Sequence, residues 1–235
     1  MHYLGGKERI SKSLAFEINQ YINDENVLEP FCGGLSMTSR IKGHIIASDV
    51  SKPLITLYKS LQNGWEPPDY VSEEDYHHYK KLQDENDPMT AFVGFGCSFS
   101  GKYFGGYARC SDNKNYALSA KKSLKRKINN CKNVKFECKS YKDYNPTNMV
   151  IYCDPPYVNT TKYKGINDFD TKEFWEIMRK WSKNNKVFIS EYTAPNDFIC
   201  ITEIQKTLGL RTKNSGNENR TEKLYTINLN PLFSL

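Results

Sequence analysis

Long apolar runs are missing from this chain, in which hydrophobic residues make up only 38% of 235 positions. No stretch approaches the roughly 18 consecutive apolar residues of a membrane helix. The first residues, 1–7, also lack the apolar core of a secretory signal. We therefore expect no membrane partner. The length suits a single domain, or one domain that carries a sizeable insertion.

Paired metal-binding or disulfide cysteines are missing as well. The seven cysteines are an odd number, and no two of them are spaced as Cys-x-x-Cys. This pattern argues against a zinc site and against a disulfide framework. We expect no metal, and we expect a reducing cytoplasm as the location.

Two common phosphate-binding fingerprints are absent too. There is no Gly-x-Gly-x-x-Gly and no Gly-Lys-Ser/Thr, which excludes the usual dinucleotide and triphosphate sites. Instead, Glu29-Pro30-Phe31-Cys32-Gly33-Gly34 follows an apolar pair, at the position where an open parallel sheet binds its ligand. Asp49 ends the next expected strand, where a carboxylate can accept both ribose hydroxyls of a nucleoside. A helix N-cap is the alternative for Asp49.

Positive charge is concentrated in one stretch of the sequence. The chain carries a net charge of +6, whereas residues 101–142 alone hold twelve Lys or Arg and two acids. That stretch is therefore +10 and the rest of the chain is −4. Basic residues interleaved with aromatic rings suit a polyanion whose bases can stack. A solvated helix face is the alternative for 121–127.

Apolar periodicity indicates an α/β core that is interrupted once. It predicts helices over 10–22, 35–41, 52–61 and 174–181, strands at 27–28, 44–49, 134–136, 150–152 and 187–189, and a closing hairpin over 208–229 with its turn at 215–217. From residue 63 no clear α/β alternation appears until Val134. We therefore expect a split α/β core formed by residues 1–57 and 130–235, around an inserted module at 58–129.

The stretch Ile151-Tyr-Cys-Asp154-Pro155-Pro156-Tyr157 ends an apolar strand on an acid. Each proline fixes φ near −65° and donates no backbone hydrogen bond, and Pro155 also keeps Asp154 out of the helical region. One carboxylate, one carbonyl and one ring are thus expected in a rigid arrangement. The alternative is a plain strand-ending turn, where Asp-Pro is common.

Five segments in order resemble the N6-adenine DNA methyltransferases of the deoxyadenosine-methylase type. They are Tyr3-Leu-Gly5-Gly-Lys7, Glu29-Pro-Phe-Cys-Gly33, Asp49, Ser140-Tyr141 and Asp154-Pro-Pro-Tyr157, and Asn219–Tyr225 resembles the closing segment of that family. The resemblance implies a class I S-adenosylmethionine-dependent methyltransferase fold. That fold has a mostly parallel seven-stranded sheet, helices on both faces, a closing antiparallel hairpin and an inserted target-recognition module.

The resemblance also implies S-adenosylmethionine as the cofactor. Its expected contacts are Tyr3, Gly5 and Lys7 from the N-terminal segment, Glu29, Pro30, Phe31 and Gly33 beneath the methionine part, Asp49 on the ribose, Ser140 and Tyr141 beside the adenine, and Asp154. A surface lysine is the alternative for Lys7, and a packing tyrosine is the alternative for Tyr141.

The expected reaction is site-specific methylation of the adenine N6 amino group in DNA, inside a bacterial or phage-infected cell. The Asp154 carboxylate and the Pro155 carbonyl are the expected acceptors for the amino group, and Tyr157 is expected to stack on the base. The base must leave the duplex to reach such a pocket. The partner is therefore duplex DNA, with single-stranded DNA left open, and the oligomeric state is undetermined.

The inserted module is expected to contact the DNA. The expected contacts are Phe99, Lys102, Tyr103, Phe104, Arg109, Lys121, Lys122, Lys125 and Arg126. A small core of the module's own is the alternative for its aromatic residues. The family's characteristic stretch for GATC is absent from this module, so we expect short or relaxed specificity around the target adenine.

Two rival functions remain open. One is an N4-cytosine DNA methyltransferase, because exocyclic amines share the same chemistry, although those enzymes more often carry Ser-Pro-Pro-Tyr. The other is a catalytically inactive DNA-binding relative. An acid at position 154 favours adenine over cytosine, and intact Lys7, Asp49 and Asp154 argue against an inactive protein.

Overall fold

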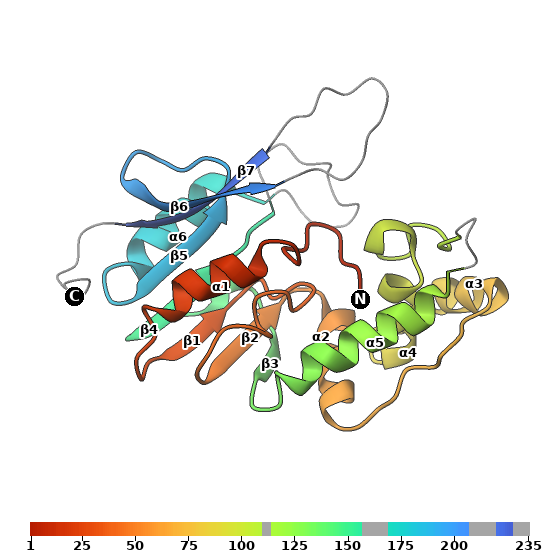
Figure 1. Cartoon of the computed structure of the whole chain (residues 1–235). Coiled ribbons are helices and arrows are strands. Elements are labelled where there is room, and N and C mark those ends of the chain that lie inside the picture. The colour runs from red at the N-terminus through yellow and green to blue at the C-terminus, as the bar shows by residue number, and fades with distance from the viewer. Residues whose placement is uncertain (110–113, 157–168, 207–219, 228–235) are drawn as a thin grey trace, which may run out of the picture.

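A computed structural model describes residues 1–109, 114–156, 169–206 and 220–227. Its strands form one seven-stranded sheet in the order β3-β2-β1-β4-β5-β7-β6 (Figure 1). They are β1 (Asn26–Glu29), β2 (Ile45–Asp49), β3 (Lys135–Cys138), β4 (Met149–Cys153), β5 (Lys186–Glu191), β6 (Phe198–Lys206) and β7 (Arg220–Ile227). Strands β1 to β5 are parallel, and β7 is antiparallel to both β5 and β6. The predicted mostly parallel sheet with a closing antiparallel hairpin is confirmed.

Helices cover both faces of the sheet, as predicted (Figure 1). The helices are α1 (Ser11–Asn19), α2 (Lys52–Gln62), α3 (Glu73–Leu82), α4 (Pro88–Ala91), α5 (Tyr116–Asn129) and α6 (Thr171–Trp181), with short turns of helix at η1 (Phe92–Gly96), η2 (Phe99–Gly101) and η3 (Tyr141–Asp143). Side chains alternate between the two faces of a strand. Thus Val150 and Tyr152 of β4 share a core with α1, while Ile151 packs with α6.

Two local predictions were wrong. The helix expected over 35–41 is a series of turns, because Leu35 has a φ of 57°, outside the right-handed helical region. The first strand of the closing hairpin is β6, which ends at Lys206, before the expected start at 208. The turn predicted at 215–217 lies outside the described residues.

The segment between α2 and β3 is mostly helical and packs against the core rather than standing apart. Phe92, Phe95, Phe104 and Tyr76 belong to the same buried cluster as the residues of α1 and α2. The expected boundary at 57 falls inside α2, whereas the one at 129 coincides with the end of α5. Among the described residues, no helix is both long and apolar enough to cross a bilayer.

Candidate active site

Carboxylates gather along one edge of the sheet, at the C-terminal ends of its parallel strands. β1 ends at Glu29, β2 at Asp49 and β5 at Glu191, and Asp154 directly follows β4. Because these strands run parallel, their C-terminal ends meet at one edge, where open α/β sheets bind ligands. Glu29, Asp49 and Asp154 were predicted at this edge, and Glu191 was not.

Lys7 places a positive charge among the carboxylates of this edge. Its side chain is only 1% exposed, and Nζ lies 2.6 Å from Asp154 Oδ1 and 3.3 Å from Glu222 Oε1. Burial disfavours the charged lysine, but the two carboxylates outweigh it and raise the Lys7 pKa above its usual value. The alternative of a surface lysine is therefore wrong. The contact joins the first segment of the chain to β4 and β7.

A tight turn brings Lys7 to this position. Gly5 has a φ of 78°, in the left-handed region that favours glycine. The Gly6 amide then donates to the Tyr3 carbonyl at 3.0 Å. The Lys7 carbonyl accepts from the Ile10 and Ser11 amides at 2.9 and 2.8 Å, so the lysine stands at the entry to α1.

Sequence reasoning missed two buried acids of this site, Glu191 and Glu222. Glu222 lies on β7 and is fully buried beside Lys7. Burial, reinforced by the neighbouring Glu222 charge, raises the pKa of Glu191 to about 7. A usable signal existed for Glu222, because it lies in the closing segment that resembles the family. Its role in the site becomes visible only in the fold, where Glu222 contacts Lys7.

Glu29 is another deeply buried acid of the edge. Burial raises its pKa to about 8, and the charges of Asp154 and Asp49 add to the effect. Its Oε2 makes no hydrogen bond to the described residues. A buried acceptor without a donor is costly, so this oxygen suits a ligand that brings a donor. Among the described residues, the two carboxylates of Asp154 and Glu222 stand against the single positive charge of Lys7, so this part of the edge favours a cationic ligand.

The turn after β1 is shaped by Tyr3. Gly33 has a φ of 40°, and a Cβ placed there would lie 2.9 Å from Tyr3 Cε1. A Cβ on Gly34 would lie 2.7 Å from Tyr3 Cβ. Glycines are thus required because the tyrosine lies directly on the turn. The Tyr58 hydroxyl donates to the Gly33 carbonyl at 2.5 Å and fixes the turn from the other side.

Asp49 ties the same turn to the start of α2. Its Oδ2 accepts from the Gly33 amide at 3.1 Å, and its Oδ1 accepts from the Ser51 amide at 2.9 Å. Burial raises the pKa of this carboxyl, while these backbone hydrogen bonds oppose the rise. Each carboxylate oxygen has a second acceptor site, so ribose hydroxyls can still be accommodated. The ribose role stays a prediction.

Aromatic rings line the edge beside β3 and β4. The Phe31 ring lies 5.2 Å from Tyr141 and 6.2 Å from Phe169, which sequence reasoning did not single out. Tyr141 is 4% exposed, and burial raises its pKa to about 12. Ser140 Oγ accepts from the Lys142 amide at 3.3 Å and caps η3. Since Tyr141 is mostly packed, the half-buried rings of Phe31 and Phe169 are the better platform for a purine.

The Asp154-Pro155-Pro156-Tyr157 segment lies only partly within the described residues. The Asp154 side chain is 20% exposed, and Pro155 is buried directly behind it. This arrangement keeps the carboxylate at the surface of the edge on a rigid support. Tyr157 lies outside the described residues, so its stacking role stays a prediction.

The aromatic residues predicted to contact DNA divide by burial. Phe99 is 66% exposed, whereas Phe104 is only 7% exposed and lies 5.5 Å from the Tyr76 ring. Tyr103 is half-buried and lies 4.6 Å from Phe95. Phe104 therefore belongs to the core of the inserted module, the alternative weighed for these rings, while Phe99 is available to a partner.

Most of the predicted basic DNA contacts already pair with acids. Lys121 Nζ lies 2.7 Å from Asp69, and Lys125 Nζ lies 2.7 Å from Glu66. Further pairs join Arg109 to Glu73 and Arg126 to Glu8. Lys102 and Lys122 are exposed and form no ion pair with the described residues.

The family model for D12 class N6 adenine-specific DNA methyltransferases matches residues 3–93 and 97–221. The match runs through Lys7, Glu29, Asp49 and Asp154. The chain belongs to this family. The predicted resemblance is confirmed, the protein is a methyltransferase, and S-adenosylmethionine is its cofactor, as expected.

Several solved structures are similar to this methyltransferase. The rRNA methyltransferase aviRa from Streptomyces viridochromogenes gives a TM-score of 0.44 at 11% identity, covering 96% of this chain and 86% of that one. The putative methylase HI0767 from Haemophilus influenzae gives 0.36 at 12% identity, covering 95% and 91%. SMU.472, a putative methyltransferase complexed with SAH, gives 0.34 at 13% identity, covering 94% and 53%.

The acid-rich edge fits the cofactor of this D12 methyltransferase. S-adenosylmethionine carries two positive groups, a sulfonium and an ammonium, against one carboxylate. The unpartnered Glu29 Oε2 offers a buried acceptor, and the surplus of acids around Lys7 complements a net positive ligand.

Proposed function

We propose that this methyltransferase acts on DNA and methylates the N6 amino group of an adenine that has been flipped out of the duplex. The observation that supports it most directly is the Asp154 carboxylate, which Lys7 Nζ approaches to 2.6 Å and which Pro155 and Pro156 follow at once. We also propose that the inserted module, residues 58–129, recognises the DNA through exposed residues such as Phe99, Lys102 and Lys122.

When bound, S-adenosylmethionine supplies an electrophilic methyl group on its sulfonium. Tyr3 and the Gly33 turn would lie against its methionine part, near Glu29 and Lys7. Asp49 would hold the ribose, and the half-buried rings of Phe31 and Phe169 would support the adenine ring. Each of these positions follows from the edge of the sheet to which the residue is fixed.

Asp154 and Pro155 act on the target base. The adenine amino nitrogen is a weak nucleophile because its lone pair is delocalised into the ring. Acceptors on its two N–H groups, the Asp154 carboxylate and the Pro155 carbonyl, draw that lone pair back toward the nitrogen. The new N–C bond would form as the methyl–sulfur bond breaks, with S-adenosylhomocysteine as the leaving group. The nitrogen would then be cationic, stabilised by the fixed negative charge of Asp154, until it loses one proton to give the neutral methylamine.

Lys7 supports this role by holding the Asp154 carboxylate in place through their ion pair. A cation in contact with a carboxylate favours its charged form, and Glu222 shares the lysine from the other side. The site therefore holds a negative acceptor at a fixed position without a metal ligand set. Among the described residues, no cluster of His, Cys, Asp or Glu could hold a metal ion.

The test is to identify the methylated nucleoside. Duplex DNA is incubated with the protein and methyl-labelled S-adenosylmethionine, digested, and analysed by mass spectrometry, with Asp154→Ala as the matched inactive control. We expect N6-methyldeoxyadenosine from the parent protein. N4-methyldeoxycytidine would favour the cytosine alternative, and label in neither nucleoside, despite bound cofactor, would favour an inactive DNA-binding relative.

A further inference from the structure

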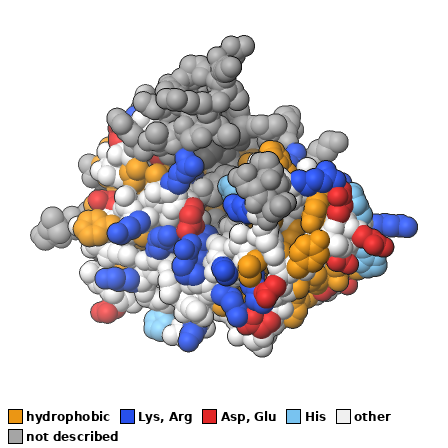
Figure 2. Space-filling model, turned by 45° about the vertical axis from the view of Figure 1, so that its right-hand side comes forward, with side chains coloured by type: hydrophobic (Ala, Val, Ile, Leu, Met, Phe, Trp, Pro, Cys, Tyr) orange, Lys and Arg blue, Asp and Glu red, His pale blue; other side chains and the backbone are white. Residues whose placement is uncertain are grey.

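A groove of about 450 Å³ lies between α1, the turns at 36–41 and the C-terminal end of α5. Its lining includes Lys12, Phe16, Asn19, Arg40, Arg126 and Lys127. In Figure 2, Lys and Arg side chains gather across the middle of the face on which α1 and α5 lie. The groove is separate from the acid-rich edge and belongs mainly to the catalytic half of the chain.

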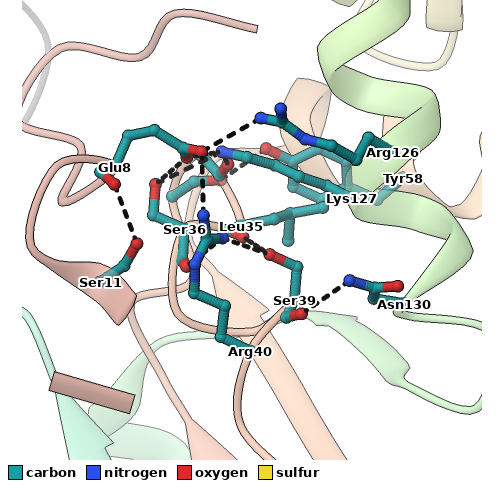
Figure 3. Close-up of polar contacts among 12 residues, drawn as sticks. Glu8, Ser11, Leu35, Ser36, Ser39, Arg40, Tyr58, Arg126, Lys127 and Asn130 are labelled. Atoms are coloured by element: carbon teal, nitrogen blue, oxygen red, sulfur yellow. Dashed lines mark hydrogen bonds and ion pairs between the residues drawn. The ribbon is translucent and has the colours of Figure 1, made fainter. Parts of the chain in front are cut away.

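Three cations of this groove converge on one carboxylate (Figure 3). An arginine nitrogen of Arg40 and one of Arg126 each lie 3.3 Å from Glu8 Oε1, and Lys127 Nζ lies 2.7 Å from Glu8 Oε2. Lys12 adds a fourth positive charge at the rim. One carboxylate cannot neutralise this group, so the groove keeps a positive surplus that suits an anionic ligand.

The cations are held in place before any ligand arrives. Arg40 donates to the Ser36 carbonyl at 3.3 Å and to Ser39 Oγ at 3.2 Å. Lys127 is 3% exposed and donates to the Gly34 carbonyl at 2.7 Å. Groups that are already ordered lose less entropy on binding. The side chains of Arg40 and Arg126 nevertheless remain 30% and 68% exposed, so a ligand can reach them.

An aromatic ring completes the groove. Phe16 is 70% exposed although it is large and apolar. It follows Lys12 by four residues on α1, so the two side chains are neighbours on one face of the helix. A cation beside an exposed ring is the combination with which proteins bind nucleic-acid strands, because the ring can stack on a base while the cation holds a phosphate.

We propose that this groove binds a DNA strand, with Lys12, Arg40 and Arg126 on backbone phosphate and Phe16 against an unpaired base. The proposal rests on the DNA substrate proposed above and extends the contact surface from Arg126, in the last helix of the inserted module, to α1 and the turns at 36–41. Guanidinium groups match phosphate geometry well. Lys121 and Lys125 on α5 face two acids, Asp69 and Glu66, whereas Arg40, Arg126 and Lys127 share the single carboxylate of Glu8.

The test compares two charge reversals of equal size. The groove variant combines Lys12→Glu with Arg126→Glu, and the control combines Lys180→Glu with Lys183→Glu at the end of α6, on the opposite face of the sheet. Binding to a labelled DNA duplex and to its single strand is measured by fluorescence anisotropy over a range of salt concentrations. For the groove variant we expect about tenfold weaker binding and a slope of log K against log salt shallower by about 1.8 on duplex.

Two further variants separate the parts of the groove. Phe16→Ala should weaken single-strand binding by at least about fivefold, with an unchanged salt slope, because stacking releases no counterions. Lys12→Glu alone should give about half the slope change of the double variant. Its side chain is exposed and lies outside the Glu8 contacts, so it keeps the test valid if the double variant fails to fold.

The outcomes are distinguishable. Unchanged DNA binding in the groove variant, or an equal loss in the control, would overturn the inference, as would inorganic phosphate binding as tightly as the strand in calorimetry. Retained S-adenosylmethionine affinity in every variant shows that the fold is intact. If the parent methylates DNA and the groove variant binds DNA like the parent, only this inference fails; a parent that binds no DNA would overturn both proposals.

Discussion

Lys7 and Glu8 are adjacent in the chain, yet they are the centres of two opposite charge networks. Lys7 is 1% exposed and contacts two carboxylates, those of Asp154 and Glu222. Glu8 is 43% exposed and contacts three cations, which are Arg40, Arg126 and Lys127. One network faces the carboxylate edge of the sheet, and the other faces the basic groove.

One short segment thus holds a cation among carboxylates and, at the next residue, a carboxylate among cations. Burial makes the Lys7 network strong, because low local polarity strengthens the attraction and makes an unpaired charge costly. Partial exposure makes the Glu8 network weaker and sensitive to salt. We therefore expect substitutions around Lys7 to affect stability and chemistry, and those around Glu8 to affect mainly the binding of anions.

The largest expected effect comes from Lys7→Met. The substitution removes the Lys7 charge from the buried carboxylate of Glu222 and from Asp154, and breaking a buried pair typically costs about 3–5 kcal/mol. Urea unfolding should show a fall of this size in the free energy of unfolding. The matched variant Glu8→Gln, at the partly exposed centre of the other network, should show a clearly smaller fall in the free energy of unfolding. Equal losses would contradict the distinction drawn between the two networks.

Asp154→Ala should abolish most of the chemistry while leaving the fold. Loss of one preorganised group aimed at developing charge typically costs about 3–4 kcal/mol, or roughly 10²–10³ in rate. Single-turnover methyl transfer to DNA measures this loss, and Glu176→Ala, an exposed acid on α6, is the control. A decrease of less than about tenfold would show that Asp154 is not the acceptor for the amino group.

The carboxylate edge should also respond to pH. The pKa of Glu29 is raised from 4.5 to about 8 by burial, so the folded state binds more protons than the unfolded state between these values. The associated stabilisation is complete below about pH 4.5 and is lost as the pH rises to about 8. Glu29→Gln should remove this loss, when unfolding is compared at about pH 5 and about pH 8.5. Exposed Glu74→Gln should retain the parent's pH dependence.

The smallest effect is expected on α5. Lys125 Nζ is already 2.7 Å from Glu66, whereas Lys122 is exposed and forms no ion pair with the described residues. Lys122→Ala should make the salt slope of duplex binding shallower by up to about 0.9, the value for one phosphate contact. Lys125→Ala should change it less. A larger change in the salt slope for Lys125→Ala than for Lys122→Ala would mean that Lys125 leaves Glu66 when DNA binds.

The sequence alone determined the five parallel strands and the acids at the ends of three of them. Local patterns sufficed for this, because apolar runs define the strands and the residue after each run lies at the ligand edge. Glu29, Asp49 and Asp154 were found in this way, and they lie along one edge of the sheet. The prediction of a helix over 35–41 was wrong because Leu35 takes a left-handed backbone conformation, which a leucine in the sequence does not predict.

Only the tertiary structure decided which charges meet. Glu222 and Lys7 are far apart in the chain and come together because β7 lies next to β5 in the sheet. The basic stretch of 101–142 appeared as a single feature in the sequence. In the fold, Lys121 pairs with Asp69, and Lys125 pairs with Glu66. Lys127 is buried and contacts Glu8 and Gly34. Burial and pairing, which set the effective charge of a residue, are properties of the packed chain.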